Sequence, residues 1–148
     1  MIDLDDIRAA AAVIASEAVV TPIQHADVLD QQVGATILGK DESQQRAGSF
    51  KFRGAFHRLS LIPAADRHLG VVAVSSGNHG AAVACAAAIL GVPATVHIPD
   101  DVAPAKRALI EQFGADIVTF DRMTPVSRSP QVILFGLHSP RRSPTGWR

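Results

Sequence analysis

Apolar and polar positions along the first 121 residues follow two patterns, one typical of helices and one typical of buried strands. Residues 4–18 combine helical apolar spacing with many alanines, and acidic residues lie where the helix dipole favours them. Short uninterrupted apolar runs are typical of strands in a parallel sheet. The runs predict strands at residues 35–38, 71–74, 94–98 and 115–120. The helical pattern predicts helices at residues 4–18, 49–61, 81–90 and 104–113.

Capping and breaking residues agree with these boundaries. Ser49 is placed to cap the second helix, and Pro63 follows its end. Gly91 and Gly114 follow the last two helices, as helix-ending glycines do. From residue 71 the order is strand, helix, strand, helix, strand, with short connections. This alternation predicts an α/β fold with an open parallel sheet and flanking helices.

The composition favours a globular unit that acts on a small molecule. The chain has 148 residues, 47% of them hydrophobic, and a mean hydropathy of +0.19. Its formal net charge of +0 provides no basic field for a nucleic acid. It contains no run of 18 apolar residues, and its acidic start is unlike a secretory signal. We therefore expect a cytoplasmic protein with no membrane and no nucleic-acid partner.

Charge divides the chain into two parts. Residues 1–121 contain all 14 acidic residues and nine lysines and arginines, a net charge of −5. Residues 122–148 contain five arginines, no acidic residue, and serine–proline sequences. Such a composition is typical of segments that do not fold alone. We expect a tail that is non-native or disordered; a nucleic-acid-binding arm is the less favoured alternative.

Lys51 lies in an unusual setting, the segment GSFKFRGA at residues 48–55. It is predicted near the start of a helix, where the dipole disfavours a positive charge, and two phenylalanines flank it. Dipole and desolvation would both lower the pKa of this lysine. A neutral lysine amine is the nucleophile in Schiff-base chemistry. The alternative from this segment alone is an ordinary solvated helix residue.

A second segment, SSGNHG at residues 75–80, joins a predicted strand to a predicted helix. Open α/β sheets bind ligands at this position, and free backbone N–H groups there form an anion site. The alternative is a turn that uses these residues only for capping. The segment lacks the glycine spacing of a dinucleotide-binding loop. The remaining histidines show no paired ligand spacing, so no metal site is indicated.

Taken together and in this order, the two segments resemble fold type II pyridoxal-phosphate enzymes, in the branch of threonine dehydratase (threonine ammonia-lyase) and serine racemase. The resemblance covers about residues 1–121. Cysteine synthases usually have an acidic residue in place of Phe52 and a threonine in place of His79. The other segments that carry the resemblance are Thr21-Pro22, Lys40-Asp41-Glu42, Gln45, GVPATVHIPDDVAPAK and IEQFGADIV.

The resemblance implies a role for each residue of the two segments. Lys51 would be the Schiff-base lysine and would move the α-proton, with Phe50 beside the ring of pyridoxal 5'-phosphate and Asn78 bonded to its phenolic oxygen. Ser76 would serve as acid or base on the opposite ring face, as in racemases. The residues implied to bind the substrate carboxylate are Ser75, Ser76, Asn78 and His79.

The resemblance also implies a fold and a reaction. The fold would be tryptophan synthase β-like, with residues 1–64 in a large domain, residues 65–121 in an incomplete small domain, and residues 122–148 as the tail. The reaction would be loss of water and ammonia from L-threonine or L-serine to give a 2-oxo acid, in a homo-oligomer. Racemisation and a non-catalytic truncated binding module are the alternatives. Because the family's phosphate-binding loop is not identified in this sequence, we expect the chain itself to be inactive.

Overall fold

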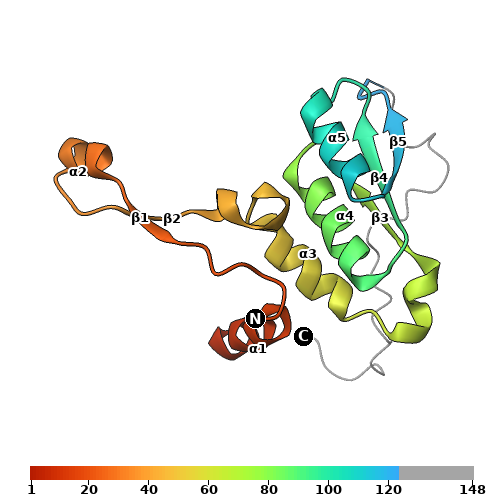
Figure 1. Ribbon diagram of the computed structural model, residues 1–148, viewed down its shortest axis with the longest axis horizontal. Helices are drawn as coiled ribbons and strands as arrows, with labels where there is room; N and C mark the ends of the chain where they lie inside the picture. The colour runs from red at the N-terminus through yellow and green to blue at the C-terminus, as the bar shows by residue number, and fades with distance from the viewer. Residues whose placement is uncertain (124–148) are drawn as a thin grey trace.

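The larger of the two sheets in the computed structural model, which describes residues 1–123, has three parallel strands and lies at one side of the molecule (Figure 1). The strands are β3 (Val71–Val74), β4 (Ala94–Pro99) and β5 (Asp116–Phe120), in the order β3-β4-β5. Val71 lies opposite Ala94, and Thr95 lies opposite Asp116. The predicted α/β fold with a parallel sheet is therefore confirmed.

Two helices connect these strands. Helix α4 (Asn78–Leu90) joins β3 to β4, and α5 (Pro104–Gln112) joins β4 to β5. The residue after α4, Gly91, has a φ of 65°, and Gly114 after α5 has a φ of 75°. These left-handed conformations suit glycine, so both predicted helix ends are confirmed. Helix α4 begins three residues earlier than predicted, because SSGNHG itself contains its first turn.

Helix α4 lies between the sheet and α3 (Lys51–Ser60), and every residue from 80 to 87 in it is buried (Figure 1). One core cluster joins α4 to α3 through Phe52, Phe56 and Leu59. A second cluster joins α4 to β4 and α5 through Val96, Ile98 and Ile110. Small side chains, mostly alanines, allow α4 to be packed on both sides. The division at residue 64 stays a prediction, and the α3–α4 cluster contains residues from both sides of it.

Residues 20–41 extend away from this core (Figure 1), whereas Ile14 and Ala18 pack against the first core cluster. Helix α1 (Leu4–Ile14) ends earlier than predicted, and strand β2 (Leu38–Lys40) begins later than predicted. The pattern missed β1 (Ile23–His25), which pairs antiparallel with β2, and α2 (Asp27–Val33) between them. Both strands are exposed along their whole length. An exposed three-residue strand carries no apolar run, which explains why the pattern did not reveal β1.

Three short 3-10 helices complete the described elements: η1 (Glu42–Gln44), η2 (Arg46–Gly48) and η3 (Ala64–Leu69). The predicted cap by Ser49 is wrong, because α3 has Phe50 as its N-cap residue and no side-chain cap bond. Cys85 is buried in α4, and burial raises the pKa of its thiol. Within residues 1–123, no helix has the length and apolar character needed to span a membrane.

A half-buried carboxylate, Glu42, joins the extended N-terminal segment to α3. The Arg53 guanidinium donates from Nε to Oε2 at 2.9 Å and from Nη2 to Oε1 at 2.6 Å. The Thr21 hydroxyl also donates to Oε1 at 2.6 Å. These contacts, chiefly the bonds from Arg53, lower the pKa of Glu42 from 4.5 to about 2. Glu42 therefore stabilises the fold in its ionised form.

Gly80 allows α4 to lie close to the sheet. A Cβ at this position would be 2.9 Å from Val96 Cγ1 and 3.3 Å from Ile110 Cδ1. Val96 is fully buried, so it has little room to move. Gly54 in α3 offers a contrast, since a Cβ there would meet nothing within 4 Å. Packing therefore requires glycine at position 80 but not at position 54.

We predict that Glu42→Gln lowers the free energy of unfolding by about 2 kcal/mol at pH 7, because a half-buried charge-assisted bond to Arg53 is lost. Since the folded pKa is lowered, this contribution is complete above the ordinary value of 4.5 and is lost as the pH falls towards 2. Urea unfolding between pH 2 and pH 7 measures both effects. The control is Glu111→Gln, whose ion pair with Arg107 is exposed and is worth less than about 1 kcal/mol. Equal losses in the two variants would contradict the role of Glu42.

We predict opposite effects of alanine at the two helical glycines. Gly80→Ala lowers the free energy of unfolding by about 1–3 kcal/mol, because the added methyl group overpacks the α4–sheet contact. Gly54→Ala raises it by about 0.5–1 kcal/mol, because alanine loses less backbone entropy in a helix. Denaturant unfolding of both variants checks the pair. A stabilising Gly80→Ala would show that the contact with Val96 does not limit packing.

Candidate functional site

The loop that follows β3 is shaped by Ser75. Its Oγ accepts the N–H of Gly77 at 3.1 Å and the N–H of Gly80 at 3.0 Å. Its own N–H donates to the His97 carbonyl at 2.9 Å, which ties the loop to β4. Both polar groups of Ser75 are therefore engaged within the loop and the sheet. The side chain acts as an internal support for the first turn of α4.

The N-terminus of α4 presents free donors. No residue in the described part of the chain accepts the N–H of Asn78 or of His79. The side chains of Ser76, Asn78 and His79 are exposed beside them. A Cβ on Gly77 would meet only the Lys106 amine, 3.4 Å away, so the space beside this glycine is open. Two free N–H groups at a helix N-terminus and an open approach suit a small anion.

Lys51 is the first residue of α3, as the sequence predicts for a helix start. Its amine lies over the Phe50 ring, 4.8 Å from the ring centroid, and both residues are exposed. Phe52 points the other way into the core, where its ring stacks on Phe56 at 5.6 Å. The desolvation expected from two flanking aromatic rings is therefore not found at Lys51. Successive helical residues point in different directions, so only one ring reaches the amine.

Lys51 and the loop lie close enough to interact. Partial desolvation lowers the pKa of His79 first, and the positive charge of Lys51 lowers it further. The packing of α3 against α4 produces this approach between residues that are far apart in the sequence. The structure thus brings together the two segments that the sequence singled out.

The residues near Lys51 fit part of a pyridoxal-phosphate site. Such a site needs a lysine amine, donors for an anion and space for a ring. The accessible amine of Lys51, the free N–H groups at Asn78 and His79, and the open space beside Gly77 meet these needs in part. Ser49, two residues before Lys51, is 6% exposed and its Oγ has no partner among residues 1–123. A buried hydroxyl without a partner is costly, which favours a polar group at this place when the site is filled.

Two features were missed by the sequence analysis. Lys106 in α5 reaches the loop at Gly77, although the sequence analysis assigned no role to this lysine. The crossover from β4 to α5 places Lys106 beside this loop. No local sequence pattern could therefore have indicated the contact.

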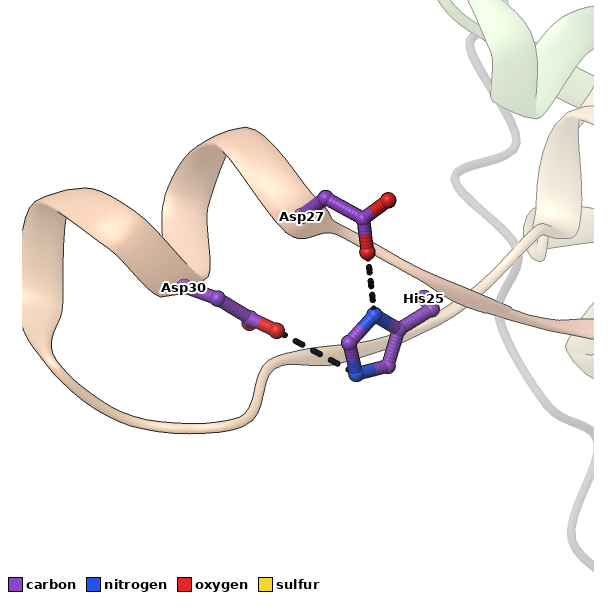
Figure 2. A group of neighbouring side chains, drawn as sticks. All are labelled: His25, Asp27 and Asp30. Carbon is purple, nitrogen blue, oxygen red and sulfur yellow. Dashed lines mark hydrogen bonds and ion pairs between the residues drawn. The ribbon is translucent and has the colours of Figure 1, made fainter.

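The second missed feature is a group of one histidine and two aspartates in the extended segment. Figure 2 shows the His25 ring between the carboxylates of Asp27 and Asp30. Nδ1 is 2.5 Å from Asp27, and Nε2 is 3.2 Å from Asp30. One ligand atom from each residue lies within 4.8 Å of the others, so the group could hold a metal ion. The two ring nitrogens of His25 contact different carboxylates, so the histidine links β1 to α2. The spacing His-x-Asp-x-x-Asp was the available signal.

Comparison with known proteins gives a family match. The model of the family described as "Pyridoxal-phosphate dependent enzyme" matches residues 14–131. This match continues past residue 121, where the sequence analysis placed the start of the tail. Most of the predicted tail, residues 124–148, lies outside the described residues, so its nature stays a prediction.

Relatives with assigned activities share this region. An L-threo-3-hydroxyaspartate ammonia-lyase from Pseudomonas sp is 48% identical over 104 residues, which are 70% of this chain and 33% of the relative. An L-threonine ammonia-lyase from Thermotoga maritima is 36% identical over 118 residues, which are 80% of this chain and 29% of the relative. The structure of maize serine racemase superposes with a TM-score of 0.77 at 39% identity, covering 80% of this chain and 36% of that one. The chain thus spans about a third of the length of these relatives.

We predict that the pKa of His79 lies below 6.5 and rises when Lys51 is replaced by methionine, because one of its two causes is removed. It stays below 6.5 in Lys51→Met, since desolvation is the larger cause. The pH dependence of the imidazole proton NMR signals measures the value. Lys40→Met is the control, because Lys40 donates to the Thr21 carbonyl and lies near Glu42 instead. A His79 pKa that does not respond to Lys51→Met would place Lys51 away from the loop.

Proposed function

Because the chain belongs to the family of pyridoxal-phosphate dependent enzymes, we propose that it carries the lysine and the carboxylate-binding side of an ammonia-lyase site. The substrate would be an L-amino acid with a β-hydroxyl group, L-threonine or L-serine. The relatives named above support this class, since 3-hydroxyaspartate, threonine and serine all contain that group. The products would be a 2-oxo acid and ammonia. The observation that carries the proposal is the approach of Lys51 to the loop that begins α4.

Each residue of the site has a proposed task. Lys51 holds the cofactor through its amine and moves the α-proton of the substrate. Asn78 and His79 bind the substrate carboxylate through backbone N–H groups, with Ser76 beside them. Ser75 supports the loop from within, because its hydroxyl and its N–H are already bonded. Phe50, whose ring is exposed, would pack against the cofactor, and the Asn78 amide would bond to its phenolic oxygen. The cofactor supplies an electron sink when bound.

Racemisation is the second candidate, and it depends on Ser76. This residue is exposed and its hydroxyl has no partner among residues 1–123, so it is free to act as acid or base. Elimination needs only Lys51 as a base, whereas inversion of the α-carbon needs a group on each face. A truncated binding module without catalysis is the remaining alternative. Homo-oligomerisation and a cytoplasmic location are further parts of the proposal. The 148-residue chain has an exposed Lys51, which argues against efficient turnover by the chain alone.

We predict that pyridoxal phosphate, added below stoichiometric amounts and reduced with borohydride, labels Lys51 in preference to Lys40 and Lys106. Lys51 is preferred over Lys40 because Lys40 is engaged with Thr21 and Glu42. It is preferred over Lys106 because the Phe50 ring lies beside the Lys51 amine and can contact the cofactor ring, whereas no aromatic ring lies at the Lys106 amine within residues 1–123. Peptide mass spectrometry of the 148-residue chain measures the occupancy of each lysine. We expect 2-oxo acid release from L-threonine and L-serine no faster than with free cofactor.

Lys51→Arg is the matched variant, since it retains the charge and forms no Schiff base. Equal labelling of all three lysines would overturn the assignment of Lys51. Turnover well above that of free cofactor would overturn the expected inactivity of the chain.

A further inference from the structure

Lys106 reaches the loop at the start of α4 from another helix. It lies in the first turn of α5, and its Nζ is 3.4 Å from the position of a Cβ built on Gly77. No other heavy atom lies within 4 Å of that position, apart from Gly77 and its chain neighbours. Gly77 has an extended φ of −164°, which any residue can adopt, so backbone conformation does not require glycine here. The glycine leaves open a space that only the Lys106 amine enters.

The charge of Lys106 is uncompensated in residues 1–123. Its neighbour Arg107 pairs with Glu111 at 2.9 Å, whereas Lys106 has no hydrogen bond or ion pair with a described residue. Its amine also lies near the N-terminus of α4, and its stem lies in the first turn of α5. Lys106 is exposed, and the partial positive charge of the two helix ends adds to that of its ammonium group, which favours an anion at this place. The positive charge of Lys51 acts on the same loop.

We propose that Lys106 binds the carboxylate of the amino-acid substrate, together with the backbone N–H groups of Asn78 and His79. This inference rests on the proposed function and adds a residue to it. A carboxylate has two oxygens and accepts from several donors at once. One oxygen can accept the backbone N–H groups while the other accepts from the ammonium group, and charge-assisted bonds of this kind are the stronger ones. The carboxylate is favoured over a phosphate group because it is the substrate's anionic group nearest to the reacting amine, and the loop lies near Lys51.

The test is a ¹⁵N NMR titration of the 148-residue chain with propionate at constant ionic strength. Propionate has the carboxylate without the amine, so binding requires neither the cofactor nor Lys51 chemistry. The amide signals of Asn78 and His79 should shift in the wild-type chain. We expect Lys106→Gln to weaken binding by about fivefold to tenfold, as loss of one charge-assisted bond implies. Lys106→Arg should restore most of the affinity.

The matched control is Arg107→Gln, which removes the same charge from the next residue of α5. It should change the affinity by less than about twofold, since exposed charges act weakly at a distance. Equal losses in Lys106→Gln and Arg107→Gln would show a general charge effect and overturn the proposal. Unchanged binding in Lys106→Gln would overturn it as well. An inorganic phosphate titration forms the second arm: dependence on Lys106 for phosphate but not for propionate would assign the residue to a phosphate group and reject the carboxylate.

A second measurement does not depend on a folded variant. The ¹³Cε signal of Lys106 in the wild-type chain should move with propionate, while that of Lys40 should not. A stationary Lys106 signal during loop shifts would overturn the proposal. Failure here is distinct from failure of the proposed function, because the labelling of Lys51 by pyridoxal phosphate is measured separately.

Discussion

The close packing of α4 against the sheet is the contact on which the rest of the structure depends. Gly80 lets the helix approach Val96 and Ile110, and the alanines that follow let α3 pack on its other side. Dense packing fixes the positions of the packed helices and strands relative to one another, because a buried side chain with no free volume around it cannot shift alone. The first turn of α4 is thereby held at the carboxyl end of β3, and the start of α3 is held beside it. Lys51 and the SSGNHG loop meet for this reason.

Electrostatics at this meeting point favour an anion. The N-terminus of α4, Lys51 and Lys106 all contribute positive charge, and the charge of Lys51 adds to desolvation in lowering the pKa of His79. In a folded protein such a concentration of like charge is unfavourable by itself. A bound carboxylate would compensate this positive charge. The arrangement that destabilises the fold without a ligand would therefore increase the affinity for an anion. The Ser75 hydroxyl accepts from the N–H groups of Gly77 and Gly80 and so fixes the loop. Among the described residues, the N–H groups of Asn78 and His79 have no acceptor and can bind an anion.

The extended N-terminal segment is joined to this core by polar contacts and by the apolar side chains of Ile14 and Ala18. Glu42 accepts from Arg53 and Thr21, and Gln45 bonds to both backbone groups of Val19. Beyond these bonds, the hairpin and α2 expose apolar side chains such as Ile23, Val28 and Leu38. The His25 group fastens α2 to β1 but does not cover these side chains. The order of residues 19–42 therefore depends on polar contacts, which makes the ionisation of Glu42 important to it.

The sequence by itself determined the parallel sheet, the order of strands and helices after residue 71, and the two segments to which we assign the proposed chemistry. These features depend on local properties: apolar runs, helix-ending glycines and the spacing of residues around Lys51. The short strand β1, the N-cap of α3 and the direction of Phe52 were decided by tertiary structure, because exposed strands lack an apolar pattern and neighbouring helical side chains diverge. Tertiary structure alone also placed Lys106 at Gly77 and His79 near Lys51. Long-range proximity follows from how α3, α4 and α5 pack, and no local pattern of residues records it.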